Sequence, residues 1–230
     1  MTNLDSLEQK IGITFTSKEL LLQAFTHRSY LNEHPGETTG HNERLEFLGD
    51  AVLELVVTDY LYRKFPTRPE GELTSIRAAV VNTNSLSFTA KEIDFNEFIL
   101  LSRGEAKDSG KARDYILANI VEALIGAIYL DQGYTVAKDF VTTWLLKKVD
   151  TIVEQQLWLD PKSLFQEKSQ ELFGITPSYR VLKESGPDHD KHFVVGVFIG
   201  DRLSAEGKGS SKQEAEREAA GSGLRKEGWG

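Results

Sequence analysis

The chain has 230 residues, 40% of them hydrophobic, and no cysteine, with 27 Lys and Arg against 35 Asp and Glu. This length suits one or two domains, and the lack of cysteine excludes disulfide frameworks, thiolate metal sites and cysteine nucleophiles. The N-terminus has no cationic segment leading into an apolar run, and the longest apolar stretch contains Asn119 and Glu122. We therefore expect a cytoplasmic protein with no signal peptide and no membrane span.

The charge is unevenly distributed along the chain. Residues 1–158 contain 16 Lys and Arg against 23 Asp and Glu, whereas residues 159–230 contain 11 against 12. A whole-chain net charge of −8 argues weakly against a nucleic-acid partner, but that charge resides almost entirely in the first part. The second part remains free to bind a polyanion.

The first part is predicted to be helical, because its apolar residues recur at three- and four-residue spacings. Thr16, Ser17 and Glu19 stand ahead of LLLQAF as a capping-box helix start. A helix is expected to stop before Pro66. The other expected elements are a loop over residues 27–42, helices over residues 43–62, 72–82 and 115–130, and a mobile polar loop over residues 108–114.

The pattern changes after about Trp158, and Asp160-Pro161 marks a boundary. We expect a helix over residues 163–173, strands over residues 179–183, 192–199 and 202–206, and a helix over residues 212–225. The last helix contains Gly221 and Gly223, which each cost roughly 1 kcal/mol against Ala, so its last turns are expected to fray. The predicted fold is an all-α domain over residues 1–157 followed by a small α+β domain, α-β-β-β-α, over residues 160–228, with both helices on one face of an antiparallel sheet.

Two apolar helices contain acidic or amide side chains at helical spacing. Between residues 45 and 57 nine of thirteen residues are apolar, yet Glu46 and Asp50 lie there four apart, with Glu43 three before Glu46. In the second helix Asn119 and Glu122 are three apart and share a face. Acids at such spacing often form a solvated face, but here the surroundings are too apolar. Buried carboxylates need a cation, a metal or a proton.

Together the two helices fit a shared divalent-metal site. Oxygen-only ligands suit Mg²⁺ or Mn²⁺. A diiron carboxylate site is disfavoured, because neither helix has a histidine at the required spacing. Oxygen-ligated Mg²⁺ most often serves phosphate chemistry, so the pattern points to phosphoryl hydrolysis or transfer.

The block HNERLEFLGDAVL, residues 41–53, resembles the signature of the ribonuclease III family. LLQAFTHRSY before it and ILANIVEAL after it resemble the same family, and the resemblance covers nearly the whole chain in the bacterial layout. It implies a homodimer whose two sites each cut one strand of an RNA duplex, leaving 5′-phosphate ends and short 3′ overhangs. Such enzymes act in the processing of ribosomal RNA precursors, messenger RNA and other structured RNA.

The resemblance also implies roles for individual side chains. Glu46 and Glu122 would be metal ligands for Mg²⁺, with Mn²⁺ able to substitute, and Glu122 would also be a catalytic carboxylate. Asp50 would be the acidic residue beside the scissile phosphate. Glu43 and Glu70 match further acidic positions of the family, Glu70 near the cleavage valley.

One position departs from the family pattern. Where the family has Asp in a pattern like ILAD-x-x-EAL, this chain has Asn119. An amide oxygen can still coordinate Mg²⁺, but without the negative charge the site should hold metal less tightly. Whether Asn119 is a natural variant or an engineered change that slows cleavage stays open.

Residues 160–228 resemble a double-stranded RNA-binding domain through DPKSLFQEKSQ, GPDHDK and GKGSSKQEAEREAA. Such domains recognise A-form shape across two minor grooves and the intervening phosphates. Gln213 stands where a second lysine is common, which should weaken phosphate binding slightly. An ordinary solvated surface is the alternative for each contact that the resemblance implies. These contacts are Gln166 and Gln170 in the first helix, His189 in the first inter-strand loop, and Ser210, Ser211 and Lys212 before the last helix.

Some alternatives remain open at this point. Arg103-Gly104 and residues 107–113 fit either a phosphate-contacting loop or an ordinary solvated one. The apolar helix over residues 43–62 fits either a dimer interface or plain core burial. For function, the rivals are a duplex-RNA-binding protein that does not cut, favoured only by Asn119, and an unrelated metal phosphohydrolase for small substrates.

Overall fold

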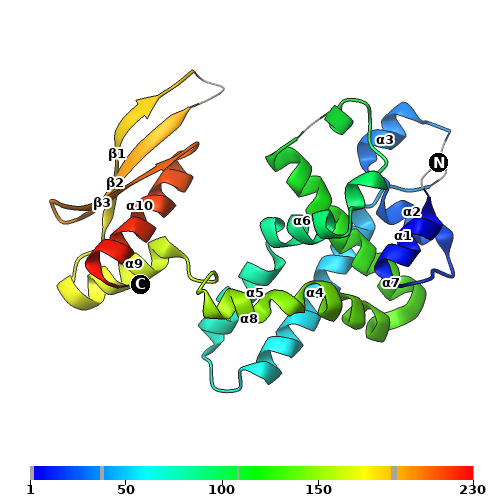
Figure 1. Cartoon of the computed structure of the whole chain (residues 1–230), viewed down its shortest axis with the longest axis horizontal. Coiled ribbons are helices and arrows are strands. Elements are labelled where there is room, and N and C mark those ends of the chain that lie inside the picture. The colour runs from blue at the N-terminus through cyan, green and yellow to red at the C-terminus, as the bar shows by residue number, and fades with distance from the viewer. Residues whose placement is uncertain (1–2, 37–38, 108, 188–190, 230) are drawn as a thin grey trace. The chain divides into compact units, whose positions relative to one another are not determined.

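The computed structural model describes residues 3–36, 39–107, 109–187 and 191–229, which form two compact units, Met1–Trp158 and Leu159–Gly230 (Figure 1). The first unit is helical and the second combines two helices with a three-stranded sheet, so the predicted fold class is confirmed. His189, a predicted RNA contact, lies outside the described residues.

The first unit is built around two long helices, α4 (Glu43–Lys64) and α7 (Lys111–Trp144). Helix α7 contains Gly133 with φ 81°, a conformation that glycine adopts without strain, and the helix kinks there. The remaining elements are α1 (Leu4–Ile11), α2 (Lys18–Ala24), α3 (Arg28–Glu33), α5 (Glu70–Val81), α6 (Thr83–Glu92), η1 (Phe95–Glu97), η2 (Glu105–Lys107), η3 (Leu146–Lys148) and α8 (Val149–Glu154).

The core of the first unit forms where α4 and α7 pack together. Leu53, Val56 and Val57 of α4 and Leu117 and Leu124 of α7 are fully buried there. The stretch Lys111–Glu154 is long and apolar enough to cross a membrane by composition, but 61% of the tested window is buried inside the protein. Burial in the core of the first unit accounts for the apolar character of this helix.

Three predictions for the first unit need correction. The helix α3 forms inside the expected loop over residues 27–42, because the ring of His27 caps it by accepting from the backbone N–H of Ser29. Helix α7 starts at Lys111, inside the expected polar loop. The cap of α2 is Ser17, and the Asp131 carboxylate accepts the N–H groups of Thr16 and Ser17 at 2.9 and 2.8 Å, so no capping box forms.

The second unit has the predicted α-β-β-β-α order. The strands pair antiparallel in the order β1-β2-β3, and residues 193, 195, 197 and 199 of β2 face the helices. Figure 1 shows both helices on the same side of the sheet. The elements are α9 (Pro161–Phe173), β1 (Ser178–Ser185), β2 (His192–Ile199), β3 (Arg202–Gly209) and α10 (Lys212–Glu227).

The expected fraying of α10 is wrong, because its glycines serve packing. The helix runs to Glu227, and Gly223 is buried against the ring of Phe165. A Cβ atom on Gly223 would lie 2.5 Å from Cε2 of that ring, whereas a Cβ on Gly221 would meet its nearest atom at 3.7 Å. The close contact between α9 and α10 therefore requires glycine at position 223 and tolerates alanine at position 221.

This pair of glycines gives a matched test of the packing. We expect Gly223→Ala to destabilise the second unit by about 1–3 kcal/mol, because the added methyl group overlaps Phe165. Gly221→Ala should stabilise it by roughly 0.5–1 kcal/mol, because alanine favours a helix. Urea unfolding of the full chain measures both, and equal midpoints for the two variants would contradict the packing argument.

Candidate active site and RNA-binding surface

Two glycines allow α4 and α7 to touch backbone to backbone. A Cβ atom on Gly49 would lie 1.7 Å from the carbonyl oxygen of Glu122, and one on Gly126 would lie 2.2 Å from that of Leu45. No other residue type fits at such distances. The helices are therefore closest where α4 carries Glu46 and Asp50, one helical turn apart, and where α7 carries Glu122.

This contact brings acidic side chains close together where they are partly buried from solvent. Burial, together with the charges of Asp50 and Glu46, raises the pKa of Glu122 to about 7. The pKa of Glu46 is also raised, first by burial and then by the charge of Glu43. The predicted cluster of Glu43, Glu46, Asp50 and Glu122 is thus brought together by the fold.

Asn119 takes part in the same cluster. Its side chain hydrogen-bonds the carboxylate of Glu46, which lowers the pKa of Glu46 against the other effects. An amide can donate this bond, whereas the charged carboxylate of an Asp would repel Glu46. Asn119 therefore stabilises the charged form of Glu46 while leaving its own carbonyl oxygen for another partner.

The oxygen atoms of these side chains suit a divalent cation. Their arrangement in this structure is not that of a complete coordination site. Within the described ranges, no three His, Cys, Asp or Glu side chains are arranged to hold a metal ion. Repelling, partly buried carboxylates gain most from a divalent cation, and their oxygens suit Mg²⁺ or Mn²⁺. Asn119 gives the site an amide oxygen in place of a further carboxylate.

Basic and histidine side chains surround Glu43 at the start of α4. Nη1 of Arg28 lies 3.4 Å from Oε1 of Glu43, and Nδ1 of His41 lies 3.7 Å from Oε2. The ring of His27 is half-buried, and burial lowers its pKa. These neighbours were not predicted, since α3 was expected to be a loop.

Glu70 lies apart from this cluster. It is the first residue of α5, and its carboxylate accepts the hydroxyl of Thr74 at 2.9 Å. With Thr58 and Tyr62 of α4 it borders a pocket of about 430 Å³. Its charge is not among those that shift the pKa of Glu46 or Glu122.

The segment over residues 100–107 is fastened to α3. The N–H of Ser102 donates to Oγ of Ser29 at 3.0 Å, and the N–H of Arg103 donates to the carboxylate of Glu33. The guanidinium of Arg113 donates to the carbonyls of Glu105 and Ala106. Arg113 therefore has a structural role here, while the side chain of Arg103 is exposed.

The predicted RNA contacts of the second unit lie at its surface. Gln166 and Gln170 are exposed on one face of α9, and Nε2 of Gln170 donates to Oγ1 of Thr176 at 3.1 Å. Ser211 caps α10 by accepting the N–H of Glu214. Lys212 is exposed, with Nζ 5.7 Å from the centre of the Phe193 ring.

A carboxylate of the chain occupies the start of α10, where the sequence favours phosphate. Glu214 accepts both the N–H and the hydroxyl of Ser210, at 2.9 and 2.5 Å. This leaves the hydroxyl of Ser210 engaged inside the protein. Lys212, the last of the predicted contacts at this helix start, has an exposed side chain.

Comparison with known proteins agrees with both units. Residues 17–149 match the family described as Ribonuclease-III-like, and residues 161–227 match the double-stranded RNA binding motif. The chain belongs to the ribonuclease III family. The predicted family is thereby confirmed over nearly the whole chain.

Individual members of the ribonuclease III family are similar over most of their length. Ribonuclease 3 of Carboxydothermus hydrogenoformans is 47% identical over 222 residues, which cover 96% of this chain and 94% of the relative. Ribonuclease 3 of Enterococcus faecalis is 45% identical over 219 residues, 95% of each chain. The solved nuclease domain of ribonuclease III from Campylobacter jejuni aligns with a TM-score of 0.58 at 42% identity, covering 63% of this chain and 97% of that one.

The raised pKa of Glu122 in this member of the ribonuclease III family predicts a pH-dependent stability. Above pH 7 the carboxylate is charged in both the folded and the unfolded chain, and burial penalises the folded one. Between pH 7 and 4.5 the folded chain takes up the proton first, so the penalty disappears. Without divalent cations, Glu122→Gln should therefore be more stable than the parent at pH 8, by about 1–2 kcal/mol once partial exposure is allowed for, and equally stable near pH 4.5.

Urea unfolding in EDTA at both pH values measures this difference. Asp139→Asn, which neutralises an exposed carboxylate of the same helix, is the matched control and should change stability little at either pH. A Glu122→Gln variant less stable than the parent at pH 8 would contradict the electrostatic argument.

Proposed function

We propose that this chain is a Mg²⁺-dependent endoribonuclease that cleaves double-stranded RNA, with Mn²⁺ able to substitute. The observation that carries the proposal is the α4–α7 contact at Gly49 and Gly126, which gathers Glu46, Asp50 and Glu122 into one repelling cluster. A double-stranded RNA binding motif in the same chain supplies the substrate class. The family supports products with 5′-phosphate ends and short 3′ overhangs, and a role in processing ribosomal, messenger and other structured RNA in the cytoplasm.

Each side chain of the cluster would have a role set by its position. Glu46 and Glu122 would hold the cation through carboxylate oxygens, with the carbonyl oxygen of Asn119 beside them. When bound, the cation activates a water and neutralises charge on the phosphate. Glu122 has a pKa of about 7 in the metal-free protein, so its carboxylate can take up a proton near neutral pH. Asp50, which is exposed, would lie beside the scissile phosphate.

Glu43 supports this arrangement from the first turn of α4. Its charge raises the pKa of Glu46, and the guanidinium of Arg28 partly balances that charge. Removal of Glu43 would therefore relax the repulsion that favours a bound cation. We assign Glu43 a positioning role.

The rival proposal, a duplex-RNA-binding protein that does not cut, is favoured by Asn119 alone. An amide at this place removes one negative charge from the site, so metal affinity and turnover should fall more than RNA affinity. The retention of four carboxylates around it favours the nuclease.

Restoring Asp at position 119 tests the proposal directly. We expect Asn119→Asp to cleave a long RNA duplex in Mg²⁺ at least about tenfold faster than the parent, because the added charge strengthens cation binding. RNA affinity in EDTA should stay the same for both forms. Single-stranded RNA and duplex DNA are control substrates that neither form should cut. Duplex binding without cutting by either form would establish the rival.

The second unit would position the duplex for cleavage. Gln166 and Gln170 offer amides that both donate and accept hydrogen bonds, as 2′-hydroxyls require. Lys212, with Ser210 and Ser211 at the start of α10, would contact phosphate, and His189 would enter a minor groove. Glu214 reduces the positive potential at this helix start.

We further propose a homodimer formed through α4. Arg44, Phe47, Ala51, Leu55, Thr58 and Tyr62 are all exposed and follow one another at three- and four-residue spacing, which makes one stripe along the helix. Phe47 is 82% exposed, Leu55 58% and Tyr62 73%. Exposed aromatic side chains in such a row mark an interface. The nuclease domain of the Campylobacter jejuni relative has a region involved in dimer formation.

The stripe is suited to pairing with itself. The segment from Phe47 to Tyr62 spans roughly 22 Å, and a two-fold axis near Leu55 would bring Phe47 to the Tyr62 end of the other copy. The 430 Å³ pocket bordered by Tyr62 and Glu70 lies at that end. This pairing would bring Glu70 of the partner subunit toward the Glu43 side of the cluster, which accounts for an acidic residue that stands apart within one chain.

Truncating the exposed ring tests the dimer. Phe47→Ala should raise the dimer dissociation constant at least about tenfold, because a buried aromatic anchor typically contributes 2 kcal/mol or more. Sedimentation equilibrium of the full chain measures it. Phe88→Ala is the matched control, since Phe88 is 60% exposed but lies on α6. The same dissociation constant for the Phe47 variant and the parent would refute the stripe as the interface.

A further inference from the structure

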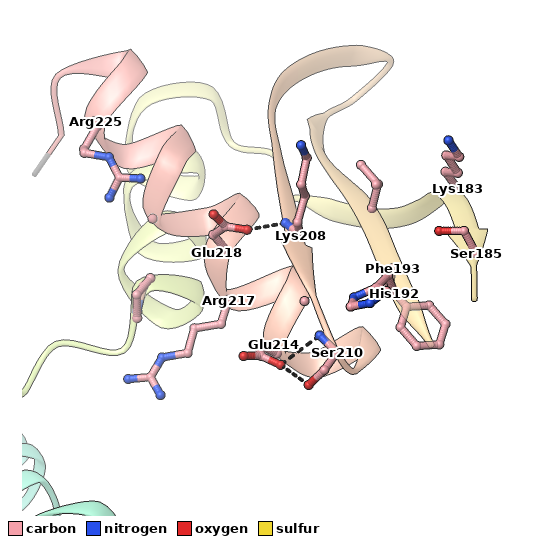
Figure 2. Close-up of a pocket in the computed structure, with 14 residues that line it drawn as sticks. Lys183, Ser185, His192, Phe193, Lys208, Ser210, Glu214, Arg217, Glu218 and Arg225 are labelled. Carbon is pink, nitrogen blue, oxygen red and sulfur yellow. Dashed lines mark hydrogen bonds between the residues drawn. The ribbon is translucent and has the colours of Figure 1, made fainter. Parts of the chain in front are cut away.

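A basic groove runs along one side of the second unit, between α10 and the ends of the strands (Figure 2). We call it the α10–β3 groove. It encloses about 1010 Å³. Its lining includes Lys183 of β1, His192 of β2, Lys208 of β3, Ser210 before α10, and Arg217 and Arg225 on α10.

Two carboxylates also line the groove, but both accept hydrogen bonds from the end of β3 and the residue after it. Glu218 accepts the N–H of Lys208, and Glu214 accepts the N–H and hydroxyl of Ser210. The bond of Glu218 satisfies a backbone donor of the edge strand β3, and the bonds of Glu214 satisfy donors of the residue that follows Gly209 at its end. Figure 2 shows Glu218 directed at Lys208 and Glu214 directed at Ser210, while the guanidinium of Arg217 extends away from them.

The cations of the groove are exposed and lack acidic partners nearby. Lys183, Lys208 and Arg217 have exposed side chains, and among the residues that the structure describes no carboxylate lies within 4.0 Å of their charged nitrogens. Two lysines of α9 are paired, Lys162 with Glu216 at 2.6 Å and Lys168 with Glu171 at 2.8 Å. The groove therefore keeps a net positive lining in a unit whose total charge is close to zero.

The spacing of these cations suits a phosphate backbone. Lys183 and Lys208 both lie opposite Val194 in the strand register, so they share the face of the sheet away from the helices, two strand spacings or about 10 Å apart. Arg217 lies on the outer side of α10, one turn beyond Gln213. Lys183 and Lys208 thus project from the outer face of the sheet and Arg217 projects from α10, with the edge of β3 between them.

We propose that Lys183, Lys208 and Arg217 bind phosphates of duplex RNA in the α10–β3 groove, extending the RNA contact beyond the start of α10 and around the edge of β3. This deepens the proposed function and rests on the second unit binding duplex RNA. It offers phosphate contacts to a domain whose helix start holds Gln213 and the carboxylate of Glu214. Each such contact releases counterions, so its signature is the salt dependence of binding.

The test measures binding of the full chain to an RNA duplex in EDTA, where no cleavage occurs, across a series of salt concentrations. The triple variant Lys183→Gln, Lys208→Gln, Arg217→Gln should lower the slope of log affinity against log salt by about two and weaken binding at least about tenfold at low salt. The variant Lys208→Arg, Arg217→Lys keeps the charges and should keep the slope.

Arg180→Gln is the matched control. Arg180 is an exposed cation of β1, but it pairs with Asp201 at 3.8 Å at the other end of the sheet, and its loss should leave the slope unchanged. A parental slope for the triple variant would overturn this inference while leaving the proposed function intact. Failure of the parent chain to bind duplex RNA would overturn both. Because the substitutions leave the backbone bonds of Glu214 and Glu218 in place, an unchanged melting temperature should confirm that the triple variant is folded.

Discussion

The backbone contact of α4 with α7 at Gly49 and Gly126 is the constraint on which the rest of the first unit depends. Side chains on touching helices converge only when nothing stands between the backbones. Here the missing Cβ atoms let carboxylates from two helices share one small volume. The long apolar surfaces of α4 and α7 supply the burial that holds the helices at this distance against the repulsion.

That repulsion links stability to the proposed chemistry. A carboxylate whose pKa is about 7 is costly to keep charged in the folded chain, and a divalent cation removes the cost. Asn119 weakens this coupling between stability and metal binding. It stabilises the charged carboxylate of Glu46 by a hydrogen bond, whereas an Asp would add a further negative charge for the metal to balance. A chain with this substitution is less strained without metal and gains less from binding it.

Glycines also allow close contacts between elements of the second unit. Gly223 lets α10 lie against Phe165, and Gly207 lets β3 lie against α10, since a Cβ on Gly207 would come within 2.1 Å of the N of Ala219. With α10 so close, Glu218 satisfies the N–H of Lys208 on the open edge of β3, and Glu214 satisfies that of Ser210 just after the strand. The same geometry turns negative groups inward and leaves lysine and arginine side chains outward, so edge protection and a positive surface arise together.

The sequence by itself determined the fold class, the helical character of the first unit, the α-β-β-β-α order of the second and the family, because periodicity and motif spacing are local properties of the chain. It also placed Glu46 with Asp50, and Asn119 with Glu122, on common faces, because a helix puts residues three or four apart side by side. Their catalytic and metal-binding roles stay predictions. Tertiary structure decided what depends on distant residues. Asp131 selects Ser17 as the cap of α2, and Phe165 makes Gly223 a packing residue instead of a weak point. Both effects join residues more than 50 positions apart, where local pattern carries no information, and only the folded chain brings them into contact.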